Sequence, residues 1–226
     1  RATKSDVPDD VRRGLRAMGR ATGAPGARRR AAHVGRLRRP IVAHGPRVGV
    51  PLGGSVAYLD RPAHRLDLKL VYWGPARGGK TTSLRSLHGS FTPADRGEMQ
   101  SVETADEQTY FFDYAPLELP RYRDLQIRVH AYTVPGQEVY VETRRRILRG
   151  ADGVLFVADA TPAAADANVV AWRQLDEELT RLDLGRRPHP VVVTVNKLDL
   201  PGARAVDDVV ASLAAAVPTR AIVDTI

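Results

Sequence analysis

The sequence predicts an α/β domain in which helices cover both faces of a mostly parallel central sheet, a doubly wound architecture. Three observations support this expectation. From Leu66 onward, strand-like and helix-like segments alternate along the chain. Residues 153–160 and 190–195 are continuously apolar, which is typical of central parallel strands buried on both faces. A glycine-rich turn at residues 74–79 separates the first expected strand from the first expected helix.

The individual elements follow from hydrophobic periodicity and from capping signals. Strands are expected at residues 66–73, 109–119, 124–134, 153–160, 190–195 and 220–226. Helices are expected at residues 80–88, 138–149 and 205–216. Thr161-Pro162 predicts the start of a further helix, because threonine caps a helix and proline fits its first position. The apolar residues that then recur at helical spacing should face the core: Val169, Trp172, Leu175, Leu179 and Leu182.

The positive charge of the chain is confined to its N-terminal part. The 226 residues carry a net charge of +8, but residues 63–226 hold 20 Lys and Arg against 22 Asp and Glu. We therefore divide the chain into a basic Arg/Gly/Pro-rich segment, 1–62, and a folded domain, 63–226. The basic segment is expected to be disordered, or to be a start-site artefact if translation begins at Val56. Contact with nucleic acid or with an anionic membrane is expected only through this segment.

The composition excludes several kinds of site. The chain has no cysteine, which rules out disulfides and thiolate zinc sites, and its six histidines show no metal-ligand spacing. Its apolar runs fall far short of the roughly 20 residues that a membrane-spanning helix needs. A soluble, cytoplasmic protein is therefore expected.

The glycine-rich turn carries the pattern G-x-x-x-x-G-K-[ST], from Gly74 to Thr81. Such a loop wraps a phosphate with its backbone N–H groups, its lysine reaches the outer phosphates, and its hydroxyl can ligate Mg²⁺. The alternative is a glycine turn without function. The residues expected to bind phosphate are Gly74, Pro75, Ala76, Arg77, Gly78, Gly79, Lys80, Thr81 and Thr82, together with Gly136 further along the chain.

A second motif, Asn196-Lys197-Leu198-Asp199, follows the last buried strand. A carboxylate at Asp199 can accept both the N1–H and the exocyclic N2–H of guanine, and adenine lacks this pair of donors. Mismatched hydrogen bonding at such a site costs affinity factors of about 10⁴ to 10⁵. Asn196, Lys197 and Asp199 are therefore the candidate guanine-binding residues, and a surface turn is the alternative. Lysine usage supports both motifs, since Lys80 and Lys197 are two of only four lysines in a chain with 30 arginines.

The segment Thr133-Val-Pro-Gly136-Gln137 has the form of a switch that responds to the γ-phosphate. The Gly136 N–H is placed to sense that phosphate, and Gln137 is the candidate catalytic residue, orienting the attacking water. Thr109, in a polar stretch entering a strand, is expected to join Thr81 on Mg²⁺ only when GTP is bound, with Thr104 as the nearby alternative. A turn without function is again the competing interpretation.

The motifs Y-W-G-P-x-x-G-G-K-T-T, T-Y-F-F-D-Y-A-P-L and T-V-P-G-Q resemble the MglA family of prokaryotic Ras-like small GTPases, over about residues 60–226. The resemblance implies a Ras-like P-loop G domain that binds GTP or GDP with Mg²⁺ and hydrolyses GTP. It further implies a cytoplasmic switch in cell polarity or gliding motility, recruited to a cell pole. A Roadblock/LC7-type dimer that stimulates hydrolysis is the implied partner. Thr133 stands where most small GTPases have an aspartate that holds the Mg²⁺ shell.

The chain departs from the family pattern at three places. Ala76 stands at the third position of the loop, which is usually glycine, and its methyl group is expected to crowd the γ-phosphate and Gln137. Gln108 stands where the family often has an arginine usable as an internal arginine finger, which leaves Arg77 as the candidate substitute. The sequence ends inside the last expected strand, so the G domain is expected to be incomplete at its C-terminus.

These features leave several functional hypotheses open. The first is a GTP switch with slow, partner-stimulated hydrolysis. The others are a nucleotide-binding scaffold with negligible turnover, and a protein that binds anionic surfaces through residues 1–62. The run Arg144-Arg145-Arg146 is expected to be a solvated helix face, or else a surface that meets an acidic partner.

Overall fold

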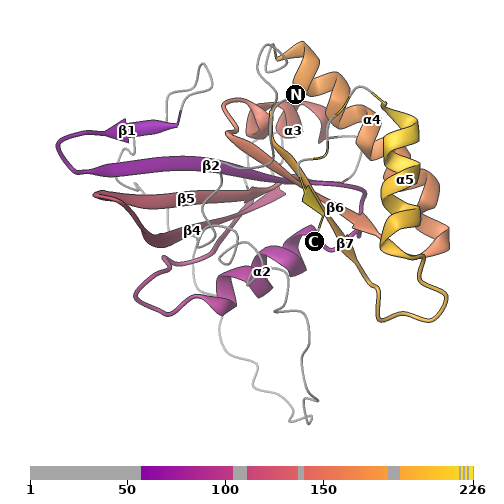
Figure 1. The fold of residues 1–226 in the computed structure, drawn as a ribbon, viewed down its shortest axis with the longest axis horizontal. Coiled ribbons are helices and arrows are strands. Elements are labelled where there is room, and N and C mark those ends of the chain that lie inside the picture. Colours follow the sequence, from indigo (N-terminus) through magenta and orange to yellow (C-terminus); the bar gives the residue numbers. More distant parts are fainter. Residues whose placement is uncertain are drawn as a thin grey trace, which may run out of the picture.

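A single mixed sheet runs through the domain, with helices on both sides of it (Figure 1). The structure, a computed structural model, describes residues 57–103, 111–136, 140–182, 189–218, 220, 222 and 224–225. Its strands are β1 (Tyr58–Asp60), β2 (Arg65–Trp73), β3 (Gln100–Glu103), β4 (Phe111–Tyr122), β5 (Leu125–Thr133), β6 (Gly153–Asp159), β7 (Val191–Asn196) and β8 (Asp224–Thr225). Its helices are α2 (Lys80–Ser90), α3 (Val141–Leu148), α4 (Ala165–Arg181) and α5 (Val206–Ala216).

The order of the strands confirms the expected doubly wound α/β architecture. The sheet runs β3-β4-β5-β2-β6-β7-β8, and β1 pairs with β2 outside this path. From β5 to β8 all neighbours are parallel, whereas β1, β3 and β4 pair antiparallel. Since β2 lies between β5 and β6, the loop that follows it opens at the middle of the carboxyl edge, where ligands of such sheets bind.

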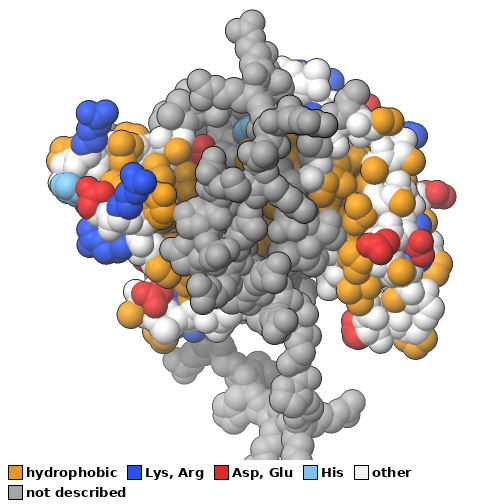
Figure 2. Space-filling view, in the orientation of Figure 1, with side chains coloured by type: hydrophobic (Ala, Val, Ile, Leu, Met, Phe, Trp, Pro, Cys, Tyr) orange, Lys and Arg blue, Asp and Glu red, His pale blue; other side chains and the backbone are white. Residues whose placement is uncertain are grey.

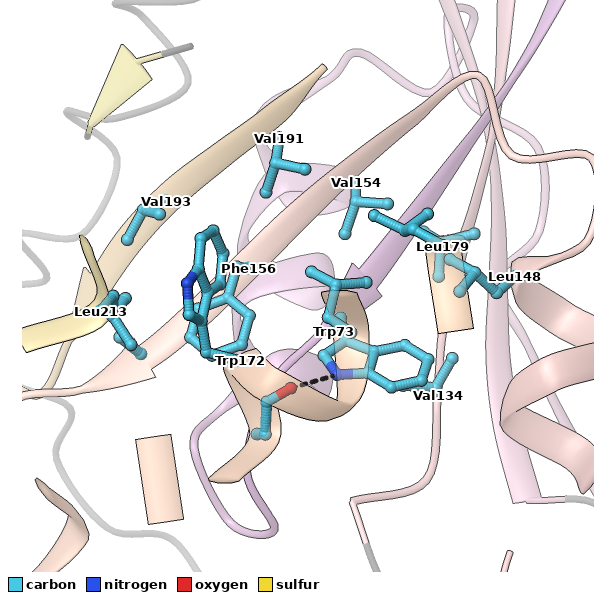
Figure 3. Close-up of a cluster of buried hydrophobic side chains, with 14 of the residues drawn as sticks. Trp73, Val134, Leu148, Val154, Phe156, Trp172, Leu179, Val191, Val193 and Leu213 are labelled. Atoms are coloured by element: carbon cyan, nitrogen blue, oxygen red, sulfur yellow. Dashed lines mark hydrogen bonds between the residues drawn. The ribbon is translucent and has the colours of Figure 1, made fainter. Parts of the chain in front are cut away.

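Two hydrophobic clusters, one on each face of the sheet, hold the helices in place. On one face, Leu84 and Leu87 of α2 pack with Leu117 and Val129 of the antiparallel part of the sheet. On the other face, residues of α3, α4 and α5 pack over β6 and β7 (Figure 3). Of the residues expected to face the core from α4, Trp172, Leu175 and Leu179 are fully buried, and Leu182 packs against the same cluster.

The turn before α4 confirms the expected proline position but not the expected cap. A 3₁₀ turn, Pro162–Ala164, precedes the α-helix, with Thr161 at its N-cap and Pro162 at its first position. The Thr161 hydroxyl donates to Asp159 Oδ1 (2.8 Å) instead of accepting from a helix N–H. Thr161 therefore binds the end of β6 and does not cap the helix. A hydrogen bond to an ionised carboxylate is stronger than one between neutral groups.

Two short strands, β1 and β3, were not among the expected elements. β1 lies within residues 1–62 and pairs antiparallel with the start of β2, from Tyr58 opposite Asp67 to Asp60 opposite Arg65. The folded part of the chain therefore reaches back to Tyr58. Each of these strands is only three or four residues long, too short to show a hydrophobic period.

The arginine run of α3 is not the solvated face that its charge predicted. Arg144 is buried. Arg145 donates from Nε and Nη2 to the two carboxylate oxygens of Glu178 on α4, at 2.9 and 3.0 Å, and only Arg146 is exposed. The helical period explains the difference, because residues 144 and 148 lie on the same face as the buried Ile147, which packs against the core.

Charged side chains of both signs lie on the face shown in Figure 2. Lys, Arg and His side chains are most prominent at the end where the β1–β2 and β4–β5 turns lie, and Asp and Glu side chains near α5. Among the described residues, no helix has the length and apolar character that crossing a bilayer requires.

Candidate functional site

The motif predicted to bind phosphate forms the loop between β2 and α2, so it lies between a strand and a helix as expected. Gly74 has φ +144°, and a Cβ there would lie 2.3 Å from the Val157 carbonyl oxygen of β6. Gly79 has φ +96°, and a Cβ there would lie 2.0 Å from Asn196 Nδ2. Both glycines are therefore required by the backbone conformation and by close neighbours.

Lys80 lies inside this loop with its ammonium against backbone carbonyls. Its Nζ donates to the carbonyl oxygens of Gly74 (3.0 Å) and Pro75 (2.7 Å), and the side chain is only 7% exposed. Burial, and then the positive charge of Arg144, lower the pKa of Lys80 to about 8. Because a buried ammonium held by neutral carbonyls lacks charge compensation from them, an anion at the mouth of the loop would stabilise it.

A cavity of about 490 Å³ opens beside the loop. It is large enough for the phosphate end of a nucleotide and brings together the loop, α2, β3, β4 and the segment after β5. The residues lining it are Arg77, Gly79, Lys80, Thr81, Thr82, Arg85, Ser101, Phe112, Asp113, Thr133, Val134, Pro135 and Gly136.

Asp113 of β4 forms the centre of an oxygen-rich cluster in this cavity. Its Oδ2 accepts from the hydroxyls of Thr81 (2.6 Å) and Thr133 (3.1 Å), and its Oδ1 accepts from Ser101 (2.7 Å). The backbone N–H of Asp113 also donates to Thr133 Oγ1 (2.9 Å), which fixes the two strands together. Sequence reasoning gave Asp113 no role, although an acidic residue on the core-facing side of an alternating strand was a usable signal.

This donor set fits a hard divalent cation better than a softer metal. Within the described residues, His, Cys, Asp and Glu side chains form no group of three or more able to hold a metal. One carboxylate with neighbouring hydroxyls suits Mg²⁺, which keeps several waters and takes further oxygens from substrate phosphates.

The expected switch segment reaches the loop through Gly136. A Cβ on Gly136 would lie 2.4 Å from Ala76 Cα and 2.9 Å from Lys80 Nζ, so its backbone rests directly on the loop. The Val134 N–H donates to the Tyr72 carbonyl (3.2 Å), which holds the start of the segment beside β2. Thr104, Gln108, Thr109 and Gln137 lie outside the described residues.

The candidate guanine-binding motif follows β7 and contacts the loop through its first residue. Asn196 is the last residue of β7, and its Nδ2 donates to the Gly78 carbonyl (3.0 Å). Asp199 lies in an exposed turn, outside the lining of the phosphate cavity. The structure therefore joins Asn196 to the phosphate loop and leaves the Asp199 carboxylate open to solvent.

Lys197 has a partner that the sequence did not reveal. Its Nζ donates to Asp159 Oδ2 (2.5 Å), at the end of the neighbouring strand β6. Burial acts to raise the pKa of Asp159, but hydrogen bonds from Lys197 and Thr161 outweigh it, and the pKa lies below its ordinary value. The buried Asn168 of α4 fixes the backbone of Asp159, accepting from its N–H (2.9 Å) and donating to its C=O (2.8 Å).

Comparisons with known proteins agree with this geometry. No family model matches the chain. Over 153 residues it is 35% identical to the mutual gliding-motility protein MglA of Myxococcus xanthus (strain DK1622), covering 68% of this chain and 78% of that protein. It is also similar to ADP-ribosylation factor-like protein 6 of Caenorhabditis briggsae, 30% over 149 residues (65% of this chain, 69% of that protein), and of Caenorhabditis elegans, 28% over 151 residues (65% and 69%).

Proposed function

The chain belongs to the MglA-like family of Ras-type small GTPases, and we propose that it is a polarity or motility switch whose slow GTP hydrolysis is accelerated by a partner. Family membership makes it a GTP-binding, GTP-hydrolysing protein. The observation that carries the proposal is the hydrogen bond from Asn196 to Gly78. It ties the base-recognising motif to the phosphate-binding loop, so that one ligand can engage both.

The proposed residue roles follow from the contacts. The loop from Gly74 to Thr82 and the N–H of Gly136 bind the phosphates, and Asn196, Lys197 and Asp199 bind guanine. Thr81 and Asp113 hold Mg²⁺, directly or through water, joined by Thr109 in the GTP state. The ion, when bound, neutralises charge on the outer phosphates. Gln137 orients the attacking water.

Two features support a slow intrinsic rate. The Gly136 backbone already lies against Ala76, so the Ala76 methyl takes up space beside the γ-phosphate and the switch. Gln108 occupies the position of an arginine that contributes about 10³ to 10⁵ in rate where it is present. Exposed Arg77 is a candidate internal substitute, and a Roadblock/LC7-type dimer is the proposed external stimulator. The MglA relative is named as a mutual gliding-motility protein, which supports a role in gliding motility. Recruitment to a cell pole is part of the same proposal.

The test begins with the nucleotide that copurifies with the protein. We expect GDP or GTP in the native protein, slow single-turnover phosphate release, and at least tenfold acceleration by a Roadblock/LC7-type dimer. Copurified ATP would contradict the role of Asp199, and Asp199→Ala should lose guanine affinity without unfolding because the side chain is exposed. If no phosphate is released either with or without the dimer, the alternative of a nucleotide-binding scaffold with negligible turnover would hold. Ala76 also favours that alternative.

A further inference from the structure

Arg144, on the helix that follows the switch segment, is buried against the residue that precedes the phosphate loop. Its side chain is 4% exposed, and its guanidinium carbon lies 4.9 Å from the centre of the Trp73 ring. Its Nη2 donates to Gln174 Oε1 on α4 (3.0 Å). A guanidinium is costly to bury unless its charge or its planar shape is used, and a methionine would fill similar space without that cost.

Trp73 is held so that movement of its indole would disturb the loop. It is the last residue of β2, it is fully buried, and its Nε1 donates to the Ala171 carbonyl of α4 (2.9 Å), the bond drawn in Figure 3. The next residue, Gly74, supplies one of the two carbonyls that bind Lys80 Nζ. The Arg144 stack is thus one residue away from the backbone that positions the loop lysine.

The same stretch of chain touches the loop a second time. Gly136 rests on Ala76 and near Lys80 Nζ, and Arg144 stacks on Trp73. The switch segment therefore contacts the loop itself, and α3 contacts the residue that precedes the loop. The positive charge of Arg144 is also felt at Lys80, so an additional phosphate near Lys80 is favoured by both cations.

We propose that Arg144 is a positioning residue that couples α3 to the phosphate loop through Trp73, and that recognition of the γ-phosphate depends on this coupling. The inference rests on the proposed function. Arg144 does not touch the reacting atoms. Its contact with Trp73 and its bond to Gln174 set where α3 lies relative to the loop, and hence how Gly136 meets the loop when GTP is bound.

The experiment compares Arg144→Met and Arg144→Lys with Arg149→Met, a change at the exposed residue that ends the same helix. Affinities for GDP and for a non-hydrolysable GTP analogue are measured with the full chain, together with single-turnover hydrolysis at saturating GTP. For Arg144→Met we expect GDP affinity within about twofold of wild type, analogue affinity at least tenfold weaker, and hydrolysis at least tenfold slower. Arg144→Lys should rescue little, since an ammonium cannot stack as a planar guanidinium does. Arg149→Met should match wild type.

A purely structural role would weaken GDP and analogue binding equally and leave their ratio unchanged. An unchanged ratio and hydrolysis rate in both Arg144 variants would overturn this inference while leaving the proposed function intact. A wild-type protein that binds no guanine nucleotide would overturn the proposed function as well. If Arg144→Met does not fold, Arg144→Lys carries the same comparison.

Indole fluorescence gives a readout independent of turnover. Trp73 and Trp172 are the two tryptophans of the chain, so Trp172→Phe leaves Trp73 as the reporter. We expect its emission to change when the analogue replaces GDP, and this change to disappear in Arg144→Met. Retention of the full change in that variant would contradict the coupling.

Discussion

A side chain at Gly79 would collide with Asn196, the first residue of the proposed guanine-binding motif. The space for its Cβ is already filled by the amide of Asn196, which at the same time binds the Gly78 carbonyl. The backbone at Gly79 also has the left-handed φ that other residues adopt with strain. Glycine at this position therefore permits both the backbone conformation of the loop and the close contact between the loop and the end of β7.

We predict that Gly79→Ala weakens binding of fluorescent GDP by at least about 100-fold. The methyl group would push Asn196 away and break its hydrogen bond to Gly78, and a misplaced loop loses several charge-assisted contacts to phosphate. Binding is measured by titration and competition with unlabelled GDP.

Gly89→Ala is the matched control. Gly89 lies near the end of α2, and a Cβ there would meet no atom within 4 Å. Because alanine favours a helix over glycine by about 1 kcal/mol, this variant should bind GDP normally and be slightly more stable. Equal loss of affinity in both variants would contradict the steric explanation.

Residues with a local sequence signature could be proposed as site residues from the sequence, and residues brought in by a neighbouring strand could not. Lys80, Thr81 and Asn196 belong to short motifs whose spacing alone indicates their chemistry. Asp113 and Asp159 have no such motif. Asp113 becomes important because β4 places it 2.6 Å from Thr81, more than thirty positions earlier in the chain, and Asp159 because β6 and β7 end side by side. The order of the strands in the sheet creates these contacts, and the local spacing of residues does not reveal that order.

At the scale of elements, contacts of Lys69 hold the middle of β2 against its neighbours, in addition to the contacts at its carboxyl end. The Lys69 N–H donates to Asp152 Oδ2 (2.7 Å). The Lys69 Nζ donates to the Arg149 carbonyl (2.9 Å) and lies 5.1 Å from the centre of the Tyr132 ring. Side chain and backbone of one residue therefore connect β2 to the turn between α3 and β6 and to β5.

The half-buried Lys69 makes stability depend on pH. Burial lowers its pKa to about 8, with Asp152 opposing the effect, whereas in the unfolded chain it is about 10.4. Between these values the unfolded chain binds more protons than the folded one, so the Lys69 contribution to the free energy of unfolding rises with pH. We predict that wild type gains roughly 1 kcal/mol relative to Lys69→Met between pH 7 and pH 9.5, once solvent screening is allowed for.

Denaturant unfolding of both proteins with saturating GDP measures this difference. Comparison with the variant cancels the other titrating groups, including Lys80. A difference in stability that stays constant with pH would show that folding does not shift the pKa of Lys69, and one that changes in the opposite direction would show that folding raises it.

Long helices and strands were predictable from the sequence. The short strands, and the burial of charged side chains that have partners, were not. The apolar runs of β6 and β7 and the helical period of α4 indicate their burial from sequence. Three-residue β1 gives no period, and its basic surroundings resemble a tail. The charges of Arg144 and Arg145 indicated solvent, but Trp73, Gln174 and Glu178 supply partners from elements distant in sequence.

At the scale of the whole molecule, the proposed ligand is part of what stabilises the fold. The loop, the switch segment and the base motif come from separate parts of the chain and meet around one cavity and one hydrogen bond. A ligand that contacts all of them binds only the folded state and adds its binding free energy to folding.

We predict that GDP at 100 times its Kd adds about 2.7 kcal/mol to the stability of the nucleotide-free protein. For a domain of this size the midpoint of thermal unfolding should rise by roughly 5–10 °C. ATP at the same concentration should produce little change, because it lacks the donors for Asp199. Thermal unfolding after removal of nucleotide with EDTA and phosphatase gives the measurement, and an equal rise with ATP would argue against guanine selectivity.

The pairing of Lys197 with Asp159 also bears on how a nucleotide would arrive. At the base end, Lys197 is neutralised by Asp159 and Asp199 adds a negative charge, whereas the cavity lining at the other end has Arg77, Lys80 and Arg85 against Asp113. The charge therefore differs between the base motif and the phosphate cavity, and we expect an approaching nucleotide to be turned with its phosphates toward the loop before contact. Its association rate should fall steeply with ionic strength while its dissociation rate changes little, a kinetic signature of long-range steering.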